Sequence, residues 1–145
     1  MINLAHTEGL DVLFTSLSFI GSHNLLNQIP LSSRVILSEV MPVPQECKWQ
    51  LCQQFINDMR SAGHKKLNRI QLEGYLNAFV FSRVAEQCTD GLNRQCLLKQ
   101  FSKFTYQDNT LNISFNNKSN QGMQQVYFSF SKGMNKAMLP PTSSH

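Results

Sequence analysis

Apolar and polar positions in the first 40 residues predict a helix end followed by two strands. Residues 2–9 have the pattern of a helix tail, and Gly9 stands where a left-handed C-cap favours glycine. The short apolar run 12–17 has the length of a strand. Residues 34–40 are rich in β-branched side chains, which predicts a second strand buried on at least one face.

Helical spacing dominates the middle of the chain, after Pro42 and Pro44 interrupt regular structure. Three helices are expected, over 46–62, 71–88 and 92–104. Their predicted inward side chains are Trp49, Cys52, Phe55, Ile56 and Met59 in the first, Leu72, Tyr75, Leu76, Phe79, Val80 and Val84 in the second, and Leu97, Leu98 and Phe101 in the third. Gly63 ends the first helix, and Gly74 is expected to permit a close approach by another element.

The last part of the chain returns to strand patterns. Residues 109–115 predict a strand, 116–122 a polar turn, and 125–131 a half-exposed strand with Val126, Phe128 and Phe130 on its inner face. Residues 132–145 are predicted to be a disordered tail. The order of elements belongs to the α/β class.

The composition and charge of the chain indicate which kinds of binding partner to expect. The 145 residues suit one domain, and the net charge of +4 is carried by scattered basic residues. The densest group, Lys65, Lys66 and Arg69, is interpreted as a solvated loop, so nucleic acid is not expected as a partner. No apolar stretch is long enough to span a bilayer, and the N-terminus lacks a signal-peptide pattern, which predicts a cytoplasmic location for the chain as written.

The four cysteines and four histidines are dispersed, so no metal site is predicted. Cys47 and Cys52 lie five residues apart on one helical pattern, which places them on different faces and argues against a disulfide. Cys88 and Cys96 flank a turn, and either a disulfide or two small buried residues fits that spacing.

No residue that could act in catalysis stands in a sequence motif that indicates a catalytic site. The chain has no nucleophile elbow, no zinc-protease helix and no glycine-rich phosphate loop. Glu73 and Tyr75 are interpreted as structural, and Cys52 or Cys96 with His64 lacks local support. The sequence predicts neither enzyme activity nor a cofactor.

Three stretches resemble the periplasmic solute-binding family of the leucine/isoleucine/valine type (type 1), which is also the extracellular ligand-binding receptor superfamily. Residues 14–22 with 35–42 resemble its Ser-Phe-x-Gly-Ser loop and the strand that leads to a proline-bearing crossover. Residues 71–78 are similar to its Ser-Leu-Glu-Gly-Tyr helix start, and 117–128 to its late Gln-Gly turn and the strand after it. The order and spacing agree over roughly residues 4–131.

The resemblance implies a partial type 1 periplasmic-binding-protein fold, an incomplete parallel sheet flanked by helices. Residues 1–40 would end the second lobe's sheet, 41–45 would be the hinge crossover, and 46–131 the C-terminal part of the first lobe with a returning strand. The family's long N-terminal part is not in this sequence. The helices over 46–62 and 71–88 would then lack a sheet to cover, as expected of a fragment.

The same resemblance places Ser16, Ser18, Phe19 and Ser22 on a loop that faces the ligand cleft. Hydroxyl and backbone N–H groups there could bond a polar solute, and Phe19 could pack on its apolar part. The alternative is that Ser22 caps a short helix over 23–28 and Phe19 fills the core. No acidic residue lies between Ser16 and Ser22, which does not favour an amino acid as the ligand.

The function implied is binding of a small polar solute for a transport system, in the periplasm. The implied partners are that solute, the missing N-terminal lobe and a membrane transporter. Two alternatives remain open, a sensory ligand-binding domain of a signalling receptor and a non-functional remnant.

Overall fold

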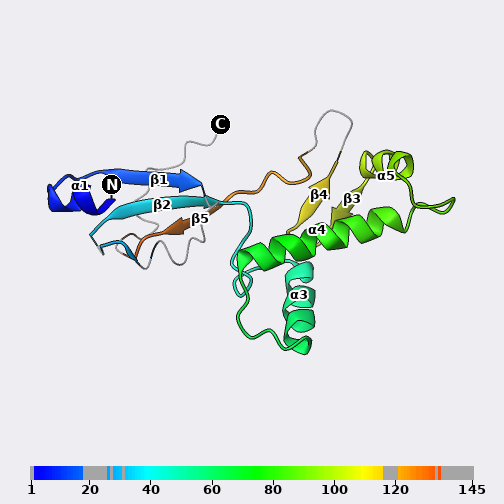
Figure 1. The fold of residues 1–145 in the computed structure, drawn as a ribbon, viewed down its shortest axis with the longest axis horizontal. Helices are drawn as coiled ribbons and strands as arrows, with labels where there is room; N and C mark the ends of the chain where they lie inside the picture. The colour runs from blue at the N-terminus through cyan, green and yellow to red at the C-terminus, as the bar shows by residue number, and fades with distance from the viewer. Residues whose placement is uncertain are drawn as a thin grey trace. The chain divides into compact units, whose positions relative to one another are not determined.

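The computed structural model describes residues 2–17, 26, 28–30, 32–115, 121–132 and 134. The chain divides into two compact units (Figure 1). The first unit comprises Met1–Val40 and Val126–His145, and the second comprises Met41–Gln125. The boundary falls where the Met-Pro-Val-Pro segment begins. The expected helix over 23–28 and tail over 132–145 lie largely outside the described residues.

The first unit is built on a three-stranded sheet. Helix α1 (Ile2–Thr7) ends before Gly9, whose φ of 66° is the left-handed conformation that its position predicted. Strand β1 (Leu13–Leu17) pairs in parallel with β2 (Arg34–Glu39), which confirms both N-terminal strands. Strand β5 (Tyr127–Phe130) pairs antiparallel with the other edge of β2, so the strand order is β1-β2-β5 (Figure 1).

The resemblance assigned 46–131 to the C-terminal part of the first lobe with a returning strand, and in the structure β5 pairs with Ile36–Glu39 in the first unit. Alternation of side chains predicts a strand but does not reveal which strand it will pair with. Val126 and Phe128, predicted to face inward, are each 57% exposed.

Ser131 extends this sheet beyond the end of β5. Its backbone N–H donates to the Val35 carbonyl at 3.0 Å, and its hydroxyl donates to the Ser33 carbonyl at 2.7 Å. The same hydroxyl oxygen accepts from the Val35 N–H at 3.2 Å. Ser131 is only 2% exposed. If its hydroxyl were removed, water could therefore hardly replace it as the hydrogen-bond partner of these backbone groups.

Replacing Ser131→Ala is therefore expected to destabilise the first unit by about 1–2 kcal/mol, since two buried backbone groups lose a partner. The measurement is hydrogen exchange at the Val35 amide, which should quicken by roughly tenfold. Ser82→Ala, at an exposed serine of the second unit, is the matched control. Unchanged exchange at Val35 would contradict the prediction.

The second unit combines three helices with a small hairpin (Figure 1). Its helices are α3 (Gln50–Ser61), α4 (Arg69–Ala85) and α5 (Arg94–Phe101). Asn68 and Gln71 form a capping box that starts α4, and Gly63 follows α3 with a φ of 85°. Strands β3 (Thr105–Gln107) and β4 (Asn112–Ser114) pair antiparallel, and β3 was not predicted.

The core of the second unit contradicts the expectation that its helices would be left uncovered. Its apolar side chains exposed by less than 3%, apart from Pro44, are Trp49, Leu51, Cys52, Phe55, Leu72, Val84, Leu111 and Ile113. They come from the start of α3, from α4 and from the hairpin, so these elements share one core. Leu98 of α5, predicted to face inward, is 54% exposed.

Both pairs of cysteines form disulfides. Cys47 and Cys52 are bonded, with their Cα atoms 6.1 Å apart, so the argument against this disulfide was wrong. It assumed one helix over 46–62, whereas α3 begins at Gln50 and leaves Cys47 outside the helix. Cys88 and Cys96 are also bonded, which decides between the two interpretations of that pair.

A close backbone approach occurs at Gly122 and not at Gly74. A Cβ added to Gly74 would meet nothing within 4 Å, so that expectation was wrong. A Cβ on Gly122 would lie 2.5 Å from the Phe115 ring. The Gly122 carbonyl also accepts from the Ser114 N–H at 2.9 Å, which holds this segment against β4.

Candidate functional site

The carboxyl ends of β1 and β2 form the first candidate site. The two strands run in parallel, so their last residues lie at the same edge of the sheet. In open α/β sheets, ligands bind outside the carboxyl ends of the strands. Ser18, Phe19 and Ser22, predicted from the resemblance, come within five residues after β1 in the sequence but lie outside the described residues.

Ser16 is the predicted site residue that the structure describes. It lies in β1 opposite Leu37, and its side chain is exposed. The hydroxyl is 3.4 Å from the Leu17 carbonyl oxygen, which is long for a bond from a hydroxyl. Ser16 can therefore exchange this weak contact for a stronger hydrogen bond to a solute at little cost.

Glu39 is a candidate that the sequence analysis missed. It ends β2, on the same face as Leu37, and is only 4% exposed. The Ser129 hydroxyl of β5 donates to its Oε1 at 3.0 Å, which supplies part of the hydrogen bonding that a buried carboxylate requires. A glutamate inside a strand pattern rich in β-branched residues, 34–40, was the signal that could have revealed it.

Ser16, Glu39 and Ser129 thus lie on one face at the carboxyl end of the parallel pair. Leu37 is opposite both Ser16 and Ser129 in the sheet register. The exposed hydroxyl of Ser16 can bond a polar solute directly, whereas the buried carboxylate of Glu39 can act on a solute only through the groups around it. This arrangement of polar side chains is suited to binding a polar solute.

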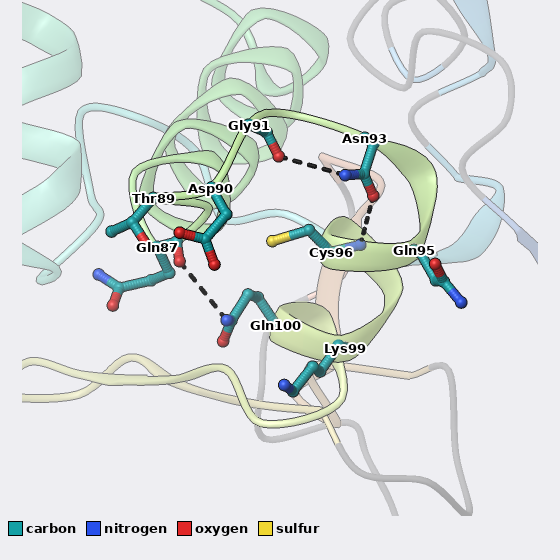
Figure 2. Close-up of a pocket in the computed structure, with 9 residues that line it drawn as sticks. All are labelled: Gln87, Thr89, Asp90, Gly91, Asn93, Gln95, Cys96, Lys99 and Gln100. Atoms are coloured by element: carbon teal, nitrogen blue, oxygen red, sulfur yellow. Dashed lines mark hydrogen bonds between the residues drawn. The ribbon is translucent and has the colours of Figure 1, made fainter.

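A second candidate is a hollow of about 470 Å³ at the turn between α4 and α5 (Figure 2). Its lining is polar: Gln87, Thr89, Asp90, Gly91, Asn93, Gln95, Cys96, Lys99 and Gln100. Figure 2 shows Asp90, Cys96 and Gln100 gathered around it. No sequence pattern indicated a function for this turn.

Most groups in this hollow already have structural roles. Asn93 Oδ1 accepts from the Cys96 N–H at 2.9 Å and so caps α5, and Cys96 is bonded to Cys88. Gln100 Nε2 lies 3.5 Å from the Gln87 carbonyl. The hollow is explained by a disulfide-closed turn, so the strand ends remain the better candidate for ligand binding.

Two polar contacts elsewhere could suggest catalysis. Ser32 Oγ lies 3.0 Å from His6 Nδ1, but both residues are exposed, whereas nucleophilic sites depend on a third group that orients the base. The Tyr75 hydroxyl donates to Asp58 at 2.5 Å. Burial and this bond raise the pKa of Tyr75 to about 12, which keeps the phenol protonated as a link between α4 and α3.

Neither a metal site nor a membrane-spanning helix is found in the part of the chain that the structure describes. No group of three or more His, Cys, Asp or Glu side chains there is arranged to hold a metal ion. None of the described helices combines the length and the hydrophobicity needed to cross a membrane.

The fold defines the class: it is α/β, a partial periplasmic-binding-protein fold with a small sheet flanked by helices. One similar solved structure is a possible leucine/isoleucine/valine-binding protein from Rhodopirellula baltica SH 1, with a TM-score of 0.74 and 15% identity. Another is an extracellular ligand-binding receptor from Verminephrobacter eiseniae ef01-2, with a TM-score of 0.70 and 20% identity.

The similarity covers most of this chain but a minor part of each relative. It spans 88% of this chain in both comparisons, and 35% and 37% of the respective solved chains. This chain therefore corresponds to about a third of either relative. No protein-family model and no curated protein matches the sequence.

Proposed function

We propose that this chain is part of a binding protein for a small polar solute, and that the carboxyl ends of β1 and β2 supply one wall of the binding site. The observation that carries the proposal is the similarity, over 88% of the chain, to two proteins described as a binding protein and a ligand-binding receptor. The exposed hydroxyl of Ser16 supports the position.

The proposed activity is reversible binding without covalent change. In the leading proposal the solute is passed to a membrane transporter. A second candidate, a sensory domain of a signalling receptor, is supported by the description of the Verminephrobacter protein as a receptor. Both candidates use the same site, and they differ in the partner that responds to binding.

The disulfides support an extracytoplasmic location for this activity. Disulfides form and persist mainly in oxidising compartments such as the periplasm, because cytosolic thiols are kept reduced. All four cysteines of this chain are paired, as Cys47–Cys52 and Cys88–Cys96. We therefore place the proposed function outside the cytoplasm.

The proposal is tested by titrating the isotopically labelled chain with amino acids, amides and short organic acids while amide resonances are recorded. Because this chain would supply one wall of the binding site, a solute of the right class is expected to bind it weakly, with a Kd on the order of millimolar. Resonances of β1, β2 and β5 should shift. Ser16→Ala should weaken binding by roughly twofold to tenfold, because one hydrogen bond is lost.

Ser82→Ala, an exposed serine of α4, is the control variant and should leave the titration unchanged. Shifts confined to the hollow between α4 and α5 would move the site there and refute the assignment to the strand ends. Saturable shifts that Ser16→Ala leaves untouched would exclude this hydroxyl as a ligand-binding group.

A further inference from the structure

The two disulfides of the second unit differ in how accessible their sulfur atoms are. Cys47 and Cys52 are 7% and 0% exposed, so the bond between them is here called the shielded disulfide. Cys88 and Cys96 are only partly buried, and they join the residues after α4 to the first turn of α5. Thiol–disulfide exchange requires a thiolate to reach one of the two sulfur atoms, so Cys88–Cys96 is the disulfide at which exchange can occur.

The hollow between α4 and α5 gives access to one of these two sulfur atoms. Cys96 belongs to its lining, whereas Cys88 does not. Figure 2 shows the Cys96 sulfur among the polar side chains around the hollow. The volume of about 470 Å³ is ample for an entering thiol side chain. A thiolate that enters the hollow therefore meets the sulfur of Cys96 first.

The position of Cys96 in α5 favours its thiolate form. Asn93 caps the helix, which makes Cys96 the third helical residue, and a side chain there points back toward the helix N-terminus. The N-terminal end of a helix favours a negative charge. Cys88 has the opposite surroundings, because its N–H donates to the Ala85 carbonyl at the C-terminal end of α4. Once it carries another sulfur, Cys96 is thus a good leaving group.

The disulfide is the strongest link between the start of α5 and the end of α4. None of the eight residues of α5 is buried. Gln100 Nε2 lies 3.5 Å from the Gln87 carbonyl, which is long for a hydrogen bond. The end of α5 is held separately, because Phe101 packs edge-on against Phe115 with ring centroids 5.9 Å apart. Opening the disulfide would free the start of the helix and leave its end in place.

We propose that Cys88–Cys96 is a thiol–disulfide exchange site, that a dithiol reductant opens it through the hollow, and that its opening releases the start of α5. The first thiolate of the reductant attacks Cys96 Sγ, forms a mixed disulfide and displaces Cys88 as a thiolate. The second thiolate attacks the reductant's own sulfur in the mixed disulfide and displaces Cys96. The reductant is thereby oxidised to its disulfide, and its two protons pass through water to the two released sulfur atoms. Solute binding at the strand ends is not required.

The test uses thioredoxin in which the resolving cysteine is replaced by serine, so that a mixed disulfide persists once it has formed. The full chain is incubated with this protein, the remaining thiols are blocked with iodoacetamide, and peptide mass spectrometry identifies the coupled cysteine. Coupling is expected at Cys96, about tenfold or more above coupling at Cys88 or at either cysteine of the shielded disulfide. Predominant coupling at another cysteine, or no coupling, would overturn the proposal.

The route of attack is tested at Asp90, whose carboxylate lines the hollow and repels an entering thiolate. Asp90→Asn should speed the reduction of Cys88–Cys96 by dithiothreitol roughly twofold to fivefold at low salt, and high salt should abolish the increase. The matched control is Glu46→Gln, which removes the same charge at an exposed position outside the lining and should leave the rate unchanged. An Asp90→Asn variant that reacts no faster than the unaltered chain would exclude attack through the hollow.

Release of α5 is measured by hydrogen exchange after brief reduction with dithiothreitol and blocking of the free thiols. The Leu97 and Leu98 amides of α5 should exchange roughly tenfold faster than in the oxidised chain. The Leu76 amide of α4 is the internal control, because Leu76 is buried in the core and its exchange should not change. If α5 exchanged at the same rate in the reduced and oxidised chains, the disulfide would not be what holds its start.

Discussion

Phe55→Ala is expected to lower the free energy of unfolding of the second unit by about 3–5 kcal/mol, the largest effect of a single substitution predicted for this chain. Phe55 lies in α3, is 0% exposed, and packs edge-on against Tyr75 of α4 with ring centroids 5.4 Å apart. Its removal leaves a cavity where α3 meets α4, and also removes the aromatic contact.

Urea denaturation followed by tryptophan fluorescence measures this loss. Trp49 is the chain's single tryptophan, is 2% exposed, and precedes α3, so its emission reports on the second unit. The control is Phe81→Ala on the exposed side of α4, which should cost less than about 0.5 kcal/mol. Equal losses in the two variants would mean that Phe55 is not part of a packed core.

The second large effect is expected from removing the Cys47–Cys52 disulfide by Cys47→Ala with Cys52→Ala. A closed loop this short restricts the unfolded chain by about 2 kcal/mol. The buried sulfur atoms add a packing loss, since Cys47 and Cys52 are 7% and 0% exposed. The total should reach about 3–4 kcal/mol in the same denaturation experiment.

The matched control is the double variant Cys88→Ala with Cys96→Ala. This disulfide closes a turn beside α5, a helix with no fully buried residue, so its loss should cost about 2 kcal/mol. Dithiothreitol should also reduce the Cys88–Cys96 disulfide before the Cys47–Cys52 disulfide, because Cys88 and Cys96 are only partly buried. The opposite order of reduction would contradict this account of the two disulfides.

The sequence predicted the elements whose apolar pattern repeats often enough to recognise. Four turns of i, i+3 and i+4 spacing predicted α4, and β-branched residues predicted β2. Strand β3 is three residues long, too short for an alternation to be distinguished from chance. The start of α3 was placed too early because residues 46–49 continue the helical spacing although the backbone there is not helical.

A group that lies far away in the sequence contacts the start of α3. Asp108, in the turn between β3 and β4, accepts through Oδ1 from the Leu111 N–H at 3.1 Å. Its Oδ2 lies 3.4 Å from the N–H of Leu51 in the first turn of α3. No local pattern could predict this contact, because the cap and the helix are 57 residues apart.

Ser16 is the described residue of the candidate site that the sequence had singled out. A resemblance placed Ser16 at the ligand-facing end of β1, and the structure puts it in that strand with an exposed side chain. Glu39 was missed because a charged residue in a strand is usually assigned to the solvent face. Only the pairing of β2 with β5, which brings Ser129 to Glu39, makes its burial understandable.

The long-range pairing of β2 with β5 also sets an order of assembly. Ile36 pairs with Phe130, so every residue of the second unit is synthesised between the two partners. As the chain leaves the ribosome, the second unit is complete while the sheet of the first unit still lacks its third strand. The second unit can therefore fold first, and its folding shortens the loop that β5 must close to reach β2.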